Sequence, residues 1–209
     1  MKYSNEQLML MMAVTSFLGW CTENLWLLAR KGYADNRNMV CPFLLGYGLA
    51  ITGFFLLAGT PQNVGLLLRF EESGTLTQGY TAYYIFSFAA VSVGEILLGS
   101  TVEAVFGFHY WDYSSLPMHI TRYTSIPTSA GFAAMITFFM GECFEPIMSV
   151  LGQIPLSLAK PAATLLVSVM AGDLVYSFRA MFMSRKLNER WRVERGAVRE
   201  HIHSVLSGR

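Results

Sequence analysis

Long apolar stretches separated by short polar segments dominate the pattern of residues along the chain. A helix that crosses the hydrocarbon core of a bilayer needs about 20 mostly apolar residues. Five stretches meet this requirement, and we expect a membrane helix in each of residues 8–29, 39–59, 80–106, 127–151 and 161–183. Residues 64–70 are apolar but too few to cross, so we expect an interfacial or re-entrant turn there. The pattern therefore predicts an all-α, polytopic membrane helical bundle.

The composition agrees with this interpretation. Hydrophobic residues make up 53% of the 209-residue chain and charged residues only 14%, whereas soluble domains average about 25% charged residues. Disordered chains, coiled coils and disulfide-stapled modules need other compositions, so these classes are excluded. We expect one transmembrane domain over residues 1–183, followed by a basic tail over residues 184–209.

Positive charge is concentrated in that tail. Residues 1–178 carry a net charge of −4 (seven Lys or Arg against eleven Asp or Glu), and residues 179–209 carry +5 (eight against three). We expect an amphipathic helix that lies on an anionic leaflet, although the retention of basic residues on the cytoplasmic side explains the charge equally well. Its apolar positions recur at helical spacing: Leu187, Trp191, Val198, Ile202 and Val205.

The basic residues of the short loops predict the orientation, because Lys and Arg are retained on the cytoplasmic side. With five spans and a cytoplasmic tail, twelve basic residues fall inside and three fall outside, namely Lys2, Arg69 and Lys160. We therefore expect an integral protein of a bacterial cytoplasmic membrane, with its N-terminus outside and its C-terminus in the cytoplasm.

Acidic residues in or near the expected spans are the most informative feature. No Lys or Arg lies well inside a span, so each carboxylate is expected to be protonated, hydrogen bonded or bound to a cation. Glu95 and Glu103 lie eight residues apart, about 12 Å along one helix and about 80° around it, and can border one cavity. A position near the interface, in contact with water, is the alternative. The six carboxylates are Glu23, Glu95, Glu103, Glu142, Glu145 and Asp173.

A polar and aromatic run, FGFHYWDYSS, follows Glu103. Its aromatic residues suit a membrane interface, and Asp112 with Ser114 suits a capping turn. The alternative is that His109 and Asp112 form the polar rim of a site whose floor is Glu95 and Glu103, because histidine can exchange protons near neutral pH.

Three segments carry a resemblance to a known family: FLGWCTEN (17–24), CPFLLGYGLA (41–50), and the stretch from Glu95 through Glu103 into FGFHYWDYS. They resemble the small membrane proteins described as "putative ABC-transporter permease, type IV" (CmpB-like), which are similar to the transmembrane protein 229 group. The resemblance implies a permease-like role and marks these motif residues for binding: Glu23, Glu95, Glu103, Trp111, Asp112, Tyr113 and Ser114. His109 joins them from the residue analysis.

The sequence thus favours a transporter or permease-like component with a carboxylate site for a cation, a proton or a polar group. A membrane enzyme that acts on a lipid or isoprenoid by acid and base chemistry is the second hypothesis, and a non-catalytic scaffold is the third. No zinc pattern, nucleic-acid motif or nucleotide-binding loop occurs, so no metal or cofactor is assigned. The expected partners are the bilayer, anionic lipid at the tail, and a second copy or a partner membrane or ATPase subunit.

Overall fold

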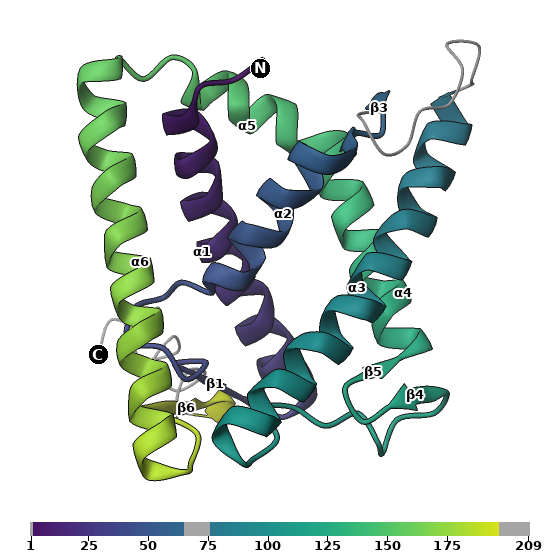
Figure 1. Cartoon of the computed structure of the whole chain (residues 1–209), viewed down its shortest axis with the longest axis vertical. Coiled ribbons are helices and arrows are strands. Elements are labelled where there is room, and N and C mark those ends of the chain that lie inside the picture. The colour runs from purple at the N-terminus through teal and green to yellow at the C-terminus, as the bar shows by residue number, and fades with distance from the viewer. Residues whose placement is uncertain (1, 65–75, 197–209) are drawn as a thin grey trace. The chain divides into compact units, whose positions relative to one another are not determined.

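The structure is a computed structural model that describes residues 2–64 and 76–196, and most of these residues are helical. The helices are α1 (Asn5–Arg30), α2 (Leu45–Ala58), α3 (Leu76–Phe106), α4 (Ile126–Phe138), the π-helix η1 (Phe139–Cys143), α5 (Phe144–Leu151) and α6 (Leu156–Ser184) (Figure 1). The described strands form three short antiparallel pairs: β1 (Tyr33–Asp35) with β6 (Arg192–Glu194), β2 (Gly59–Thr60) with β3 (Asn63–Val64), and β4 (His119–Thr121) with β5 (Thr124–Ser125).

Four helical segments are long and apolar enough to cross a membrane: α1, α3, the continuous segment from α4 to α5, and α6. The helix α2, which corresponds to the second expected span, is also apolar but has only 14 residues, which is about 21 Å at 1.5 Å per residue. The expected all-α membrane fold is confirmed. The helix in the second expected span is shorter than the apolar stretch 39–59 that predicted it.

The chain divides into two compact units. One consists of Met1–Leu49 with Ser157–Arg209, and the other of Ala50–Leu156. Each unit has its own core, in which Met11, Met170 and Met181 are buried in the first unit and Tyr83 and Phe144 in the second. Flexible methionines can fill the irregular gaps between helices of the first unit.

In the first unit, α1 and the start of α2 approach closely at two glycines. A side chain at Gly19 would overlap the Tyr47 ring, and one at Gly48 would overlap the Met12 backbone and the Ser16 hydroxyl. Small residues allow such an approach between membrane helices. The two motifs around these glycines therefore form one packed contact.

The second span was expected to begin at Met39, but residues 39–44 are not helical and α2 begins only at Leu45. Pro42 disfavours helical backbone in the residue before it. The backbone N–H groups of Val40 and Cys41 donate hydrogen bonds to the two carboxylate oxygens of Asp173, at 2.9 and 2.8 Å. Asp173 on α6 thus holds a non-helical segment where a longer helix was expected.

The fourth span is interrupted by η1. Pro146 has no N–H, and its ring clashes with the carbonyl four residues earlier in a regular helix, which here belongs to Glu142. The wider π turn ends directly before α5, and α5 continues through Pro146 to Leu151. A proline inside a helix ends or kinks it, and here the irregularity lies in the turn before Pro146.

The tail also differs from expectation. Residues 187–191 form no helix, and β6 follows and pairs with β1 in the register Ala34↔Val193. The rings of Trp191 and Trp20 pack edge to face, with centroids 6.2 Å apart. The rest of the expected tail helix, from residue 197, lies outside the described residues, as does the segment 65–70 for which a re-entrant turn was expected.

Candidate functional site

Glu95 on α3 lies in a cluster of hydroxyl groups. The Thr124 hydroxyl donates a hydrogen bond to Oε2 of Glu95 at 2.7 Å, and the Ser129 hydroxyl lies 3.4 Å from the same oxygen. The Tyr113 side chain hydrogen bonds to the carboxylate as well. Thr124 and Ser129 are completely buried, so the carboxylate is held by donors that water does not reach.

Thr124 and Ser129 also hydrogen bond to each other at 2.8 Å. When Glu95 is ionised, Thr124 donates its one proton to the carboxylate, and Ser129 donates to Thr124. A protonated Glu95 can instead donate to Thr124, because a hydroxyl accepts as well as donates. This pair of hydroxyls therefore satisfies either protonation state of Glu95.

No lysine, arginine or histidine among the described residues forms an ion pair with Glu95. The half-buried Glu95 relies on neutral hydroxyl donors.

The loop that brings these hydroxyls to α3 is built by local interactions. Ser125 caps α4 in a reciprocal arrangement with Thr128, which places Thr124 and Ser129 on either side of the cap. The Trp111 indole N–H donates to the Tyr123 carbonyl at 2.8 Å. The Tyr123 ring lies on Gly99 of α3, where a side chain would overlap it. The loop between α3 and α4 (Figure 1) is thus anchored directly on the helix that carries Glu95.

Glu103, nearer the end of α3, has basic partners. Its Oε1 lies 3.4 Å from Nδ1 of His109 and 3.6 Å from Nη1 of Arg122. Arg122 Nη1 lies 2.7 Å from Nε2 of His109, and because a guanidinium only donates, this contact assigns the imidazole proton to Nδ1, facing Glu103. The loop thus supplies Glu103 with two basic partners. Arg122 was not expected there, whereas one interpretation of the sequence placed His109 in the same site as Glu103.

Asp112 and Ser114 form a turn of their own. Asp112 Oδ1 accepts a hydrogen bond from the Ser114 backbone N–H at 2.8 Å. The Ser114 side chain and its backbone N–H hold the pKa of Asp112 below its usual value. Both residues are exposed, so the carboxylate of Asp112 is used in the turn, whereas Tyr113 between them reaches Glu95.

Glu23 belongs to the other unit and also has partners. The Tyr47 hydroxyl donates to its Oε1 at 2.6 Å, and Arg37 Nη2 lies 3.1 Å from its Oε2. Arg37 also lies 3.5 Å from Asp35. Glu23 was expected to lack a basic partner, and the loop after α1 provides one. Its contacts explain why the two motifs of α1 and α2 occur together.

The site residues that the sequence analysis missed are Thr124, Ser129 and Arg122. The run Ser125–Pro127–Thr128 is typical of a helix start, so the position of the cap could have been predicted. The contact of its neighbours with Glu95, which is 29 residues away or more, depends on the path of the loop. In the described parts of the chain, no group of three His, Cys, Asp or Glu residues is placed to hold a metal.

The comparisons with known proteins place this chain in a family. Residues 10–178, which run from α1 into α6, match the family described as "Putative ABC-transporter type IV". No curated protein and no solved structure matches the chain significantly. Together with the apolar helices, the family match identifies a transporter-like integral membrane protein. This chain belongs to the "Putative ABC-transporter type IV" family.

Proposed function

We propose that this protein is the membrane component of a transporter in which Glu95 binds or relays a cation or a proton. The observation that carries the proposal is the set of neutral hydroxyl donors around a carboxylate on a membrane helix, without an ion-pair partner among the described residues. Such a carboxylate keeps its charge available for a transported ion.

The energetics support this role. An ionised carboxylate in hydrocarbon costs on the order of 3 kcal/mol on insertion scales. The hydroxyls of Thr124 and Tyr113 reduce this cost in the ionised state, with Ser129 donating to Thr124, and the Thr124 hydroxyl can accept a hydrogen bond from a neutral Glu95. A site that tolerates both states can take up an ion and release it.

Glu103, His109 and Arg122 suggest a path from this carboxylate to the surface. Glu103 is eight residues from Glu95, about 12 Å along α3. Its side chain is 37% exposed, and those of His109 and Arg122 are 35% and 48% exposed. His109 and Arg122 hold Glu103 at the exposed end of this path.

The proposed orientation has the N-terminus outside and this path open to the cytoplasm. Arg122 and the basic residues near the C-terminus favour it. The β1–β6 pair supports it independently, because it joins the C-terminal ends of α1 and α6 (Figure 1). With both ends on one side of the bilayer, the chain must cross an even number of times between them. The segments α3, α4 to α5, and α6 give three crossings, so α2 with its non-helical flank serves as the fourth.

Energy and assembly are part of the proposal. The sequence has no nucleotide-binding loop, so an ion gradient or a partner ATPase would drive transport. A bundle of five spans is small for a complete carrier, and a second copy or a partner membrane subunit would complete it. Anionic lipid at the basic tail and a relation to the transmembrane protein 229 group belong to the same proposal.

The test measures ion flux through purified protein in liposomes. We expect wild-type protein to carry protons, Na⁺ or K⁺ faster than empty liposomes under an imposed gradient, with protons followed by a trapped pH-sensitive dye. Glu95→Gln should reduce the rate by about tenfold or more, because it removes the titrating oxygen. Thr124→Val should reduce it less, because Ser129 and Tyr113 remain.

The matched control is Glu189→Gln, which removes a carboxylate from an exposed ion pair with Arg192 and should leave the flux unchanged. Equal rates for wild type and folded Glu95→Gln, or no flux of any of the three ions above empty liposomes, would contradict the proposal. A lipid product present with wild-type protein and absent with Glu95→Gln would favour a membrane enzyme instead.

A further inference from the structure

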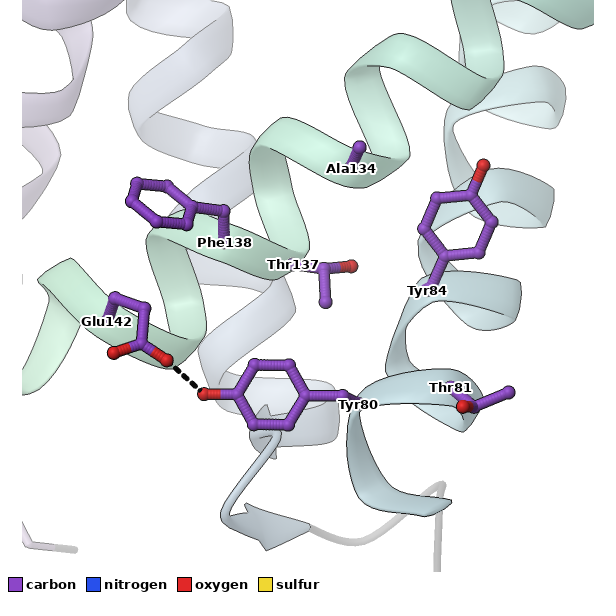
Figure 2. Close-up of a pocket in the computed structure, with 7 residues that line it drawn as sticks. All are labelled: Tyr80, Thr81, Tyr84, Ala134, Thr137, Phe138 and Glu142. Carbon is purple, nitrogen blue, oxygen red and sulfur yellow. Dashed lines mark hydrogen bonds between the residues drawn. The ribbon is translucent and has the colours of Figure 1, made fainter. Parts of the chain in front are cut away.

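A second polar site lies at the other end of the α3 and α4 pair, about 22 Å along α3 from Glu95. It is an open pocket of about 440 Å³, a size that suits a small organic molecule. Figure 2 shows Tyr80 and Tyr84 of α3 on one side, with Thr137 of α4 and Glu142 of η1 on the other.

The π-helix shapes this pocket. A side chain at Gly141 would overlap the Tyr80 phenol, so the glycine lets that ring lie against η1. The Tyr80 hydroxyl donates to Glu142 Oε1 at 2.5 Å and accepts a hydrogen bond from Gln62 Nε2 at 2.8 Å. Gln62 also donates to the Gly141 carbonyl. The carboxylate and the first aromatic ring are therefore held in place.

Thr137 is the unexplained residue of this pocket. Its hydroxyl is buried and has no hydrogen-bond partner among the residues that the structure describes, and the residue is 7% exposed. The hydroxyls of Thr81 and Thr101 on α3 donate to carbonyls four residues earlier, at 2.9 and 2.7 Å, which is the usual arrangement in helices. The Thr137 hydroxyl faces the space between the rings of Tyr80 and Tyr84 (Figure 2).

The charge of the pocket is also uncompensated. No basic residue in the described ranges pairs with Glu142. The Tyr84 hydroxyl donates a long hydrogen bond, 3.5 Å, to the Ala130 carbonyl, which positions the ring. Ala134 and Phe138 make the rest of the lining largely apolar. Aromatic faces beside an anion attract organic cations.

We propose that this pocket binds an organic ammonium group with apolar substituents, held by Glu142, the rings of Tyr80 and Tyr84, and the Thr137 hydroxyl. The pocket does not suit Mg²⁺ or Ca²⁺, which need six or more oxygen ligands. A neutral hydrocarbon chain would leave the carboxylate and the hydroxyl unsatisfied. The ammonium group can belong to a free amphipathic amine or to a lipid headgroup.

The test measures binding of radiolabelled benzylammonium, whose N–H groups can donate to Glu142 and to the Thr137 hydroxyl, to the full chain in dodecylmaltoside micelles, which contain no ammonium groups. We expect saturable binding that Glu142→Gln weakens by about tenfold, the loss typical of a removed charge partner. Thr137→Val and Tyr84→Leu should each weaken it by about threefold. Glu145→Gln, on the next helical segment and outside the pocket lining, is the matched control and should bind as wild type does.

A second measurement does not depend on the folding of any variant. Ethylbenzene, the neutral carbon isostere of the probe, should fail to displace it from wild-type protein. Displacement by phosphatidylethanolamine but not by phosphatidylglycerol would support the site with a lipid headgroup as its ligand, and displacement by neither would support a free amine. Equal binding by wild type and folded Glu142→Gln, or displacement by the neutral isostere, would overturn the proposal. Flux through Glu95→Gln tests a separate site.

Discussion

Two glycines of α3 differ in what surrounds them, and this difference predicts their tolerance to substitution. A side chain at Gly99 would overlap the Tyr123 ring, whereas the space around Gly94 is open. We expect Gly99→Ala to lower the free energy of unfolding by about 1–3 kcal/mol, the usual cost of overpacking. Gly94→Ala should be neutral or slightly stabilising, because alanine favours helix. Thermal unfolding of both variants in detergent checks this, and equal melting temperatures would contradict it.

The turn at Asp112 predicts a pH dependence. Its pKa is lowered by the Ser114 side chain first and by the Ser114 backbone N–H second. A carboxylate with a lowered folded-state pKa stabilises the fold above its unfolded pKa, and this contribution is lost as the pH falls through the folded value. Ser114→Ala should raise the pKa of Asp112 toward its ordinary value, but only in part, because the backbone N–H remains. NMR titration of the carboxyl carbon measures the shift, and an unchanged pKa would show that the side chain is not its cause.

At the residue scale, the absence of Lys and Arg inside the spans predicted carboxylates without basic partners, and Glu95 forms no ion pair among the described residues. The same argument failed for Glu23 and Glu103. It considered charges inside spans, whereas Arg37 and Arg122 reach these glutamates from loops. Long arginine side chains can extend from a loop back to a helix, and hydrophobic patterning contains no information on that path.

The β1–β6 pair gives a prediction at the element scale. Ala34 and Val193 are direct partners in its antiparallel register, and partners across two strands have Cβ atoms about 5 Å apart. With the three native cysteines replaced, Ala34→Cys with Val193→Cys should form a disulfide on mild oxidation. Ala34→Cys with Glu194→Cys should not, because successive side chains point to opposite faces. Gel mobility with and without reductant measures both, and equal cross-linking of the two pairs would refute the register.

Helices were more predictable than their interruptions. The five apolar stretches correspond to α1, α2, α3, the segment from α4 to α5, and α6, because burial in lipid requires the pattern that was searched for. The late start of α2 depends on Asp173, which is more than 130 residues away. The β6 strand likewise depends on its pairing with β1, whereas the π turn lies beside Pro146 of its own segment.

For the whole molecule, we predict five crossings with the N-terminus outside. In a chain without native cysteines, a membrane-impermeant maleimide should label Ser4→Cys and Gln153→Cys in cells that expose the outer face of the membrane. Ser115→Cys and Glu194→Cys should react only after permeabilisation. Labelling of Ser4→Cys and Glu194→Cys from the same side would contradict the odd number of crossings, since two termini on one side require an even number.

The amino-acid sequence by itself determined the class of this protein and its helical spans, because these follow from the local cost of placing apolar and charged groups in water or lipid. The tertiary structure alone decided which side chains meet: the hydroxyls around Glu95, the pairing of Glu103 with His109 and Arg122, and the unpartnered Thr137 beside Glu142. These contacts join residues far apart in the chain, and their geometry arises only when helices and loops pack together.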